Sequence, residues 1–119
     1  MPPTVLVVDD DGVFRGLAAR MLAAMGLDVV GEVGTLNSAV DAASRLRPES
    51  ALVDVGLPDG NGIDLAERLA SLPWRPRVVL TSSDPDVTSD AAARRLGAVG
   101  FIAKDQLPSR QLRTMLAGE

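Results

Sequence analysis

Residues 5–11 read VLVVDDD, an apolar and mostly β-branched run that ends in three carboxylates. A continuous apolar run of this length is typical of a strand that is buried on both faces of a sheet. Strands of this kind occur in parallel sheets, where helices cover both faces. The stretch therefore predicts the first strand of a parallel sheet, followed by an acidic turn at its carboxyl end.

The rest of the chain repeats this alternation of short apolar runs with helical patterns. Apolar residues at three-and-four spacing run from Phe14 to Met25, with Asp11 as the expected cap before them and Gly26 after them. Further strands are expected at residues 28–33, 51–55, 78–80 and 101–103, and further helices at residues 36–46, 63–72, 86–96 and around 112–116, with Pro108 near the start of the last. Five strands alternating with five helices predict one α/β domain over residues 1–119, a doubly wound parallel sheet with helices on both faces.

The composition restricts the chemistry that this domain can perform. Cysteine and histidine are both absent, which excludes disulfides, thiolate nucleophiles, zinc-thiolate sites and histidine general bases. Reactive groups are therefore limited to carboxylates, hydroxyls, lysine and the backbone. The formal net charge of -4 and the presence of only three aromatic residues argue against direct binding to nucleic acid.

The sequence also bears on where the protein is found. No apolar run is long enough to cross a bilayer. The first residues, MPPT, lack the basic flank and the small-residue cleavage site that mark an export signal. We therefore expect a cytoplasmic location and no membrane partner.

Polar residues stand at the carboxyl ends of four predicted strands. Asp9 and Asp10 follow the first strand, Asp54 closes the third, Thr81 the fourth and Lys104 the fifth. In open parallel sheets the reactive site lies beyond the carboxyl ends of the strands. Taken one at a time, these residues are commonplace helix caps, turn formers or solvated side chains. Their convergence on one edge of the predicted sheet is what indicates a site.

These residue types suit phosphoryl transfer with a metal ion. Clustered carboxylates repel one another unless a cation lies among them, and hard oxygen ligands suit Mg²⁺, so we expect Asp9 and Asp10 to hold Mg²⁺. With the metal bound, Asp54 can attack a phosphorus atom as a carboxylate nucleophile and give an acyl phosphate. Lys104 and the metal would offset the charge on the transferred oxygens, and Thr81 would hydrogen-bond one of them.

Four stretches follow one another at the predicted strand ends: VVDD at residues 7–10, DVGLPDGNG at residues 54–62, LT at residues 80–81 and GFIAK at residues 100–104. In order and spacing they resemble the receiver domain of two-component response regulators, over essentially the whole chain. The resemblance implies a flavodoxin-like sheet with strand order 2-1-3-4-5. It implies that Asp54 accepts the phosphoryl group. It also implies that Asp10 is the principal ligand of Mg²⁺ or Mn²⁺, that Asp9 binds directly or through water, and that the Gly56 carbonyl is a further ligand.

The same resemblance implies a conformational switch. Thr81 and Lys104 carry over as the switch hydroxyl and the phosphate-binding lysine. Phe101 matches the rotating aromatic that couples the site to the face formed by the fourth helix, the fifth strand and the fifth helix, with a plain core position as the competing interpretation. The predicted helix at residues 86–96 has the thinnest apolar stripe, so we expect it to move. The domain would be a phosphoacceptor that catalyses its own phosphorylation and dephosphorylation, and not a turnover enzyme.

The resemblance further implies partners. A histidine kinase or a phosphotransfer protein would lie upstream, and a protein target or a fused output domain downstream. A homodimer through the face of the fourth helix, fifth strand and fifth helix is a further expectation. Ser82, Asp105 and Asp11 depart from the commonest receiver pattern, and the Lys104-Asp105 pair resembles receivers that precede DNA-binding output domains.

The same residues bear on three other function classes. An aspartate-based phosphatase of the haloacid-dehalogenase type needs a second acid two residues after the nucleophile, and that position is Gly56. A flavodoxin-like electron carrier needs a phosphate loop after the first strand, where three acids would repel the cofactor phosphate. A receiver-shaped binding module that works without phosphorylation is the alternative that the sequence leaves open.

Overall fold

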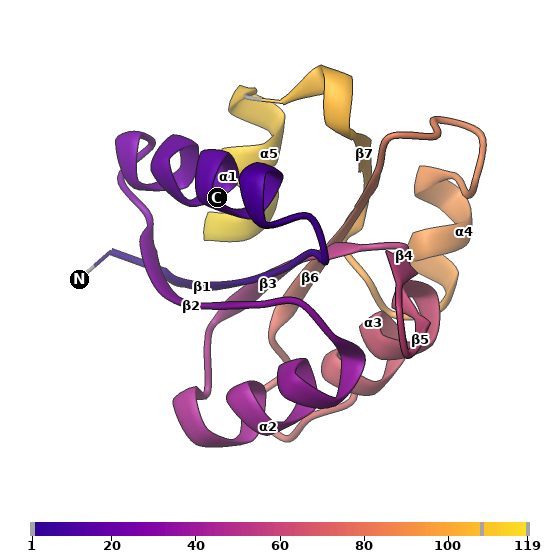
Figure 1. Cartoon of the computed structure of the whole chain (residues 1–119), viewed down its shortest axis with the longest axis horizontal. Coiled ribbons are helices and arrows are strands. Elements are labelled where there is room, and N and C mark those ends of the chain that lie inside the picture. The colour runs from indigo at the N-terminus through magenta and orange to yellow at the C-terminus, as the bar shows by residue number, and fades with distance from the viewer. Residues whose placement is uncertain (1, 108, 119) are drawn as a thin grey trace.

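The computed structural model describes residues 2–107 and 109–118 and shows a five-stranded parallel sheet between two layers of helices (Figure 1). Its strands are β1 (Thr4–Val8), β2 (Asp28–Val33), β3 (Ser50–Asp54), β6 (Arg77–Ser82) and β7 (Gly100–Ala103). They pair in the order β2-β1-β3-β6-β7, and every pairing in this sheet is parallel. Counted along the chain, this is the predicted order 2-1-3-4-5, which is confirmed.

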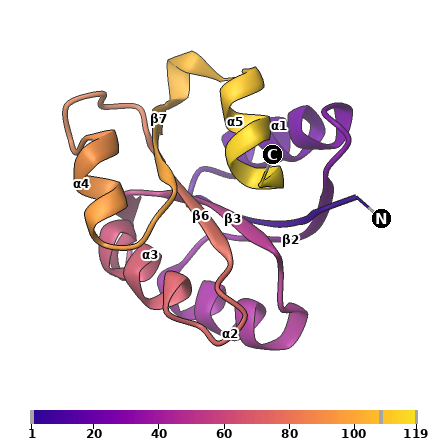
Figure 2. The same ribbon diagram turned by 180° about the vertical axis from the view of Figure 1, so that it is seen from behind.

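Helices cover both faces of the sheet. They are α1 (Gly12–Ala24), α2 (Leu36–Leu46), α3 (Gly62–Ala70), α4 (Asp90–Arg95) and α5 (Arg110–Ala117). Helices α1 and α5 pack on one face and α2, α3 and α4 on the other, as the views from the front and from behind show (Figure 1 and Figure 2). None of the helices within the described ranges is long and apolar enough to span a membrane.

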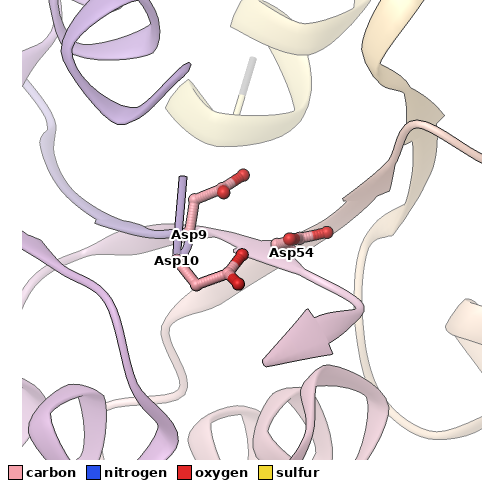
Figure 3. Close-up of side chains that lie close together, drawn as sticks. All are labelled: Asp9, Asp10 and Asp54. Carbon is pink, nitrogen blue, oxygen red and sulfur yellow. The ribbon is translucent and has the colours of Figure 1, made fainter. Parts of the chain in front are cut away.

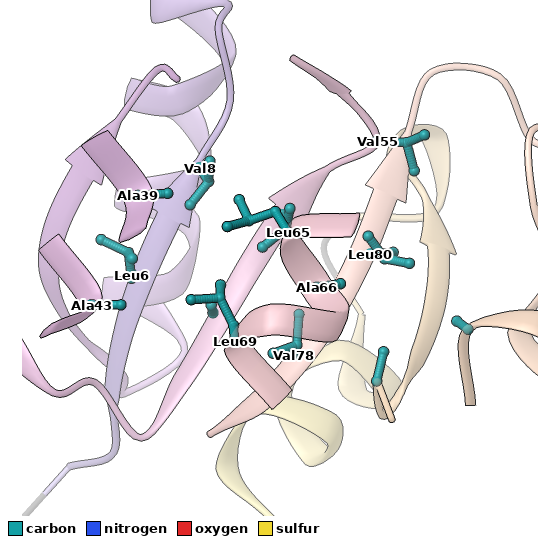
Figure 4. Packing of buried hydrophobic residues seen from close by; sticks show 14 of the residues in the cluster. Leu6, Val8, Ala39, Ala43, Val55, Leu65, Ala66, Leu69, Val78 and Leu80 are labelled. Carbon is teal, nitrogen blue, oxygen red and sulfur yellow. The ribbon is translucent and has the colours of Figure 1, made fainter. Parts of the chain in front are cut away.

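The first strand contributes side chains to two separate cores, because successive residues of a strand point to opposite faces of the sheet. Leu6 and Val8 pack with residues of α2 and α3 (Figure 4). Val5 and Val7 pack instead with residues of α1 and α5. All four side chains are closed off from solvent. The uninterrupted apolar run at residues 5–8 is therefore a consequence of burial on both faces.

Each helix begins with a side-chain cap on the edge of the sheet that carries the carboxyl ends of the strands. The capping residues of α1 to α5 are Asp11, Thr35, Asn61, Ser89 and Ser109. The side-chain oxygen of each accepts a hydrogen bond from a backbone N–H of the first turn, which otherwise has no partner within the helix. The predicted cap at Asp11 is confirmed, and this edge of the sheet collects the polar residues of the fold.

The fourth helix is shorter than predicted. It spans Asp90–Arg95 and not residues 86–96. A turn before this helix is closed by two hydrogen bonds to Asp84. The side chain of Asp84 accepts one from the N–H of Asp86, and its backbone carbonyl oxygen accepts the other from the N–H of Val87. Val87 is 41% exposed. The predicted start at residue 86 is wrong because one apolar residue in an exposed loop happens to match helical spacing.

Short elements complete the edge that carries the site. An antiparallel hairpin of β4 (Gly56–Leu57) and β5 (Gly60–Asn61) follows β3, and the sequence pattern does not predict it. A single 3-10 turn, η1 (Lys104–Gln106), follows β7. Pro108, expected near the start of the last helix, lies outside the described residues.

Candidate functional site

Three aspartates meet at the carboxyl edge of the sheet. Asp9 and Asp10 follow β1, and Asp54 is the last residue of β3, its neighbour in the sheet. One carboxylate oxygen of each lies within 4.8 Å of the others, and Figure 3 shows the three side chains close together. The structure thus brings together three acids that lie far apart in the sequence, because parallel strands end at the same edge.

The first two carboxylates differ in exposure and in partners. Asp9 is buried and Asp10 is exposed. Oδ1 of Asp9 accepts a hydrogen bond of 2.9 Å from the backbone N–H of Asp11. Nη1 of Arg15 donates a hydrogen bond of 2.6 Å to the backbone carbonyl of Asp9. The end of β1 is therefore fixed to the first turn of α1, and Asp10 faces solvent.

Lys104, the only lysine in the sequence, enters the site from the end of β7. Its Nζ lies 2.7 Å from Oδ2 of Asp9 and 3.7 Å from Oδ2 of Asp54. The same Nζ lies 4.0 Å from the centroid of the Phe14 ring on α1. The lysine side chain is 17% exposed. The ammonium group therefore bridges the carboxylates of two strands while an aromatic face lies against it.

The surroundings of Asp54 raise the pKa of its carboxyl above the ordinary value. Burial is the largest cause, because it disfavours the charged form, and the negative charges of Asp9 and Asp10 also raise this pKa. The Lys104 ammonium and a hydrogen bond from the Gly56 N–H, 3.4 Å from Oδ1, act in the opposite direction. A cation among the three carboxylates would remove this repulsion.

Thr81 lies next to Asp54, since β6 pairs with β3 so that these two residues are register partners. Its side chain is 1% exposed, and its Oγ1 has no hydrogen-bond partner within the described ranges of the chain. Buried hydroxyl groups are normally hydrogen-bonded. An oxygen atom carried by a ligand on Asp54 would supply the partner that this hydroxyl lacks.

The two remaining predicted site residues lie at the margins of the carboxylate cluster. Phe101, on β7, is half-buried against the core covered by α2, α3 and α4. Its backbone N–H donates a hydrogen bond of 3.2 Å to Oδ1 of Asp90, the first residue of α4. Gly56 is exposed and begins the hairpin after Asp54. Phe101 therefore belongs in part to the core and also connects β7 with α4.

Three residues of the site were not singled out in the sequence: Phe14, Arg15 and Asp59. The carboxylate of Asp59 accepts hydrogen bonds of 2.7 Å and 3.1 Å from the backbone N–H groups of Leu36 and Asn37, which lowers the pKa of Asp59. These bonds tie the hairpin after β3 to the start of α2. Asp59 lies within the receiver-like stretch at residues 54–62, but its partners lie 23 and 22 residues away along the chain, so no local pattern indicates these hydrogen bonds.

The donor atoms fit a hard divalent cation. Carboxylate oxygens are the ligands that Mg²⁺ and Mn²⁺ take in proteins, and three of them converge here. The sequence contains no cysteine or histidine that would favour a softer metal. The exposed side of Asp10 leaves the cluster open to solvent.

Comparison with known proteins shows the family of the chain. The family model of the response regulator receiver domain matches residues 5–117. The chain belongs to this family. In it, receiver domains act as phosphorylation-operated parts of two-component response regulators and bind Mg²⁺ at an acidic pocket. Receiver domains of this family are phosphoacceptors and not classical enzymes.

Relatives and solved structures agree with this assignment. DNA-binding transcriptional activator DevR/DosR of Mycobacterium tuberculosis is 42% identical over 109 residues, which cover 88% of this receiver domain and 48% of the relative. Chemotaxis protein CheY of Thermotoga maritima is 27% identical over 115 residues, which cover 97% of this receiver domain and 96% of CheY. The signal receiver domain of a modulated diguanylate cyclase from Desulfovibrio desulfuricans G20 superimposes with a TM-score of 0.82 at 30% identity, over 97% of this chain and 90% of that one.

The receiver domain spans about half the length of the first of these relatives, 48% of DevR/DosR and 57% of PdtaR from Mycobacterium tuberculosis. The predictions of the fold, of the family and of a phosphorylation-operated function are confirmed. The roles of individual site residues in this receiver domain stay predictions.

Proposed function

We propose that this domain is a signalling switch whose phosphoryl acceptor is Asp54. The observation that carries the proposal is the meeting of Asp54, at one edge of the sheet, with two further carboxylates, the Lys104 ammonium and the buried Thr81 hydroxyl. During transfer, a carboxylate oxygen of Asp54 bonds to phosphorus while the bond between phosphorus and the donor breaks, and the leaving group keeps the electron pair. The product is an acyl phosphate on Asp54.

The same carboxylates would hold Mg²⁺, or Mn²⁺ in its place. Asp10 is the better candidate for principal ligand, because both carboxylate oxygens of Asp9 already have partners in Lys104 and in the N–H of Asp11. Asp54 and the backbone carbonyl of Gly56 complete the proposed set. When bound, the metal supplies positive charge that neutralises the acidic cluster and offsets the charge on the phosphoryl oxygens.

The phosphoryl group would act on the conformation of the domain through several contacts at once. Moving a two-state equilibrium from 1:99 to 99:1 requires about 5.5 kcal/mol of differential binding. One hydrogen bond to a charged group contributes about 1.5–3 kcal/mol, so no single contact suffices. Thr81 and Lys104 would therefore act together, and Phe101 would follow Thr81 because β7 is the strand next to β6. Through the hydrogen bond between Phe101 and Asp90, the change would reach α4.

The proposed phosphoryl source is a histidine kinase or a phosphotransfer protein, and the proposed recipient of the signal is a protein target or a fused output domain. A fused output domain is supported by DevR/DosR, whose name describes a DNA-binding transcriptional activator and whose length is about twice that of the matched region. A homodimer through the face formed by α4, β7 and α5 is a further proposed interaction.

Intact mass spectrometry tests the acceptor. The protein is incubated with Mg²⁺ and acetyl phosphate, with Asp54→Asn as the control. One phosphoryl adduct that requires Mg²⁺ and disappears in Asp54→Asn is the expected result. An adduct that persists in Asp54→Asn would place the acceptor elsewhere. No adduct on the wild type, with Mg²⁺ binding established separately, would favour a binding module that works without phosphorylation.

A further inference from the structure

The ammonium group of Lys104 has two kinds of partner. Its Nζ lies 2.7 Å and 3.7 Å from the Oδ2 atoms of Asp9 and Asp54. The same Nζ lies over the ring of Phe14, 4.0 Å from the ring centroid. A cation at this distance from an aromatic face is attracted by the quadrupole of the ring. Lys104 is thus held from β1, from β3 and from α1.

The carboxylates alone do not fix the position of this ammonium group. A lysine side chain is a flexible four-carbon stem with a compact charge, and its three donors rotate freely. The shorter contact, to Asp9, draws Nζ away from the acceptor Asp54. Contact with the Phe14 ring adds a third restraint on Nζ, from α1, to those from Asp9 and Asp54. Because the lysine is 17% exposed, this contact is largely protected from water, which strengthens it.

We propose that Phe14 is a positioning residue for phosphoryl transfer, which holds the Lys104 ammonium beside Asp54 through contact with its aromatic face. The proposal rests on the role of Lys104 in phosphoryl transfer proposed above. Phe14 itself touches neither the acceptor nor the phosphoryl group, and acts through Lys104. Phe14 is the third residue of α1 after the Asp11 cap, so the position of its ring depends on where α1 begins.

Phe14 packs against the core that α1 and α5 cover, so its replacement must keep an apolar side chain there. It is half-buried and lines an apolar groove of about 470 Å³ between α1 and η1, together with Leu17, Met21 and Leu107. Leucine at position 14 keeps an apolar side chain in this groove but has no aromatic face. Tyrosine at position 14 keeps the aromatic face. Leu17, which is 52% exposed and lines the same groove, is the matched position for a control.

The first measurement is the phosphorylation rate with acetyl phosphate and Mg²⁺, without a kinase, so that no docking partner contributes. We expect Phe14→Leu to slow phosphorylation about fivefold, which corresponds to about 1 kcal/mol in the activation free energy. Phe14→Tyr should restore the rate to within about twofold, and Leu17→Ala should not change it. The melting temperature of Phe14→Leu should stay within about 3 °C of the wild type, since the groove remains filled.

The second measurement uses the fact that Lys104 is the only lysine. Protein labelled with ¹³C and ¹⁵N in lysine gives one set of side-chain signals, which can be followed without metal or phosphodonor. In the wild type we expect nuclear Overhauser contacts between the Hε protons of Lys104 and the ring protons of Phe14. In Phe14→Leu we expect faster side-chain motion at the Cε of Lys104, whereas Leu17→Ala should leave this motion unchanged.

The outcomes separate this proposal from the proposed function. No phosphorylation of the wild type would overturn both. Normal phosphorylation of the wild type with an equal rate in Phe14→Leu, or an equal loss of rate in Leu17→Ala, would overturn the positioning role alone. If Phe14→Leu fails to fold, the wild type and Phe14→Tyr still test the proposal. Absence of nuclear Overhauser contacts between Lys104 and the Phe14 ring in the wild type would overturn it. Presence of these contacts, together with a phosphorylation rate of Phe14→Tyr close to that of the wild type, would support it.

Discussion

Replacing Asp54 with asparagine should stabilise the protein at neutral pH when no divalent metal is present. Asp54 is 7% exposed and shares its space with the carboxylates of Asp9 and Asp10. Asparagine has nearly the same shape and keeps an oxygen that can accept the hydrogen bond from the Gly56 N–H, but it carries no charge. The substitution therefore removes electrostatic repulsion and leaves the packing almost unchanged.

The separations within the site set the size of this effect. At an effective dielectric constant of about 20, two like charges at 4.8 Å, the upper limit of the separations between the three carboxylate oxygens, repel by about 3.5 kcal/mol. The attraction of Asp54 to Lys104 at 3.7 Å is about 4.5 kcal/mol. The attraction to Lys104 thus roughly cancels the repulsion from buried Asp9. What remains is the screened repulsion from exposed Asp10 and the loss of hydration of a buried carboxylate. We expect Asp54→Asn to raise the free energy of unfolding by about 2 kcal/mol.

The effect should depend on pH in a defined direction. Because the pKa of Asp54 is raised, the native protein holds this proton more tightly than the unfolded chain does. The contribution of Asp54 to the stability of the wild type therefore falls as the pH rises from the ordinary carboxyl value of 3.8 through the raised pKa of Asp54. The advantage of Asp54→Asn should be largest at neutral pH and should shrink as the pH approaches the ordinary value.

Urea denaturation in EDTA, at about pH 7 and about pH 4.5, measures both the effect and its pH dependence. Asp64→Asn makes the same change of charge at an exposed position of α3 outside the carboxylate cluster, and should alter the free energy of unfolding by less than about 0.5 kcal/mol. Added Mg²⁺ should stabilise the wild type more than Asp54→Asn, because the variant lacks one proposed ligand. An Asp54→Asn protein that is less stable than the wild type in EDTA at neutral pH would refute the reasoning.

Gly62→Ala should lower the free energy of unfolding by about 3 kcal/mol and impair phosphorylation, because a Cβ there would overlap the backbone carbonyl oxygen of Asp54. Urea denaturation measures the loss, and Gly56→Ala, where the Cβ meets open space, should show far less. Thr81→Val should leave the thermal stability of the unphosphorylated protein unchanged or raise it by about 1 kcal/mol, since the buried hydroxyl has no partner in the part of the chain that the structure describes. A clear loss of stability there would show that the hydroxyl already has a partner. Asp59→Ala should lower the melting temperature at neutral pH, and the difference from the wild type should vanish as the pH falls through the lowered pKa of Asp59, because protonation ends the same hydrogen bonds. A difference that persists at low pH in thermal melts would count against this role of Asp59.

The site itself divides into residues that the sequence indicates and residues that it does not. The sequence indicates four of the site residues because each stands at the end of an apolar run: Asp9, Asp54, Thr81 and Lys104. The structure places them at one edge of the sheet. The sequence includes Asp59 in the receiver-like stretch at residues 54–62 but does not indicate its role, because its hydrogen-bond partners belong to α2.

The sequence by itself determined the alternation of strands and helices, the parallel sheet and the edge on which the polar residues gather, whereas the strand order came only from the resemblance to receiver domains. It could do so because burial on both faces forces continuous apolar runs, and because parallel strands all end on one side. Only the tertiary structure decided where α4 begins, which residue braces the hairpin after β3 and which ring lies against Lys104. These features depend on distances between segments that are remote in the sequence. The raised pKa of Asp54 also depends on the tertiary structure, because its burial and its charged neighbours exist only after the chain has folded.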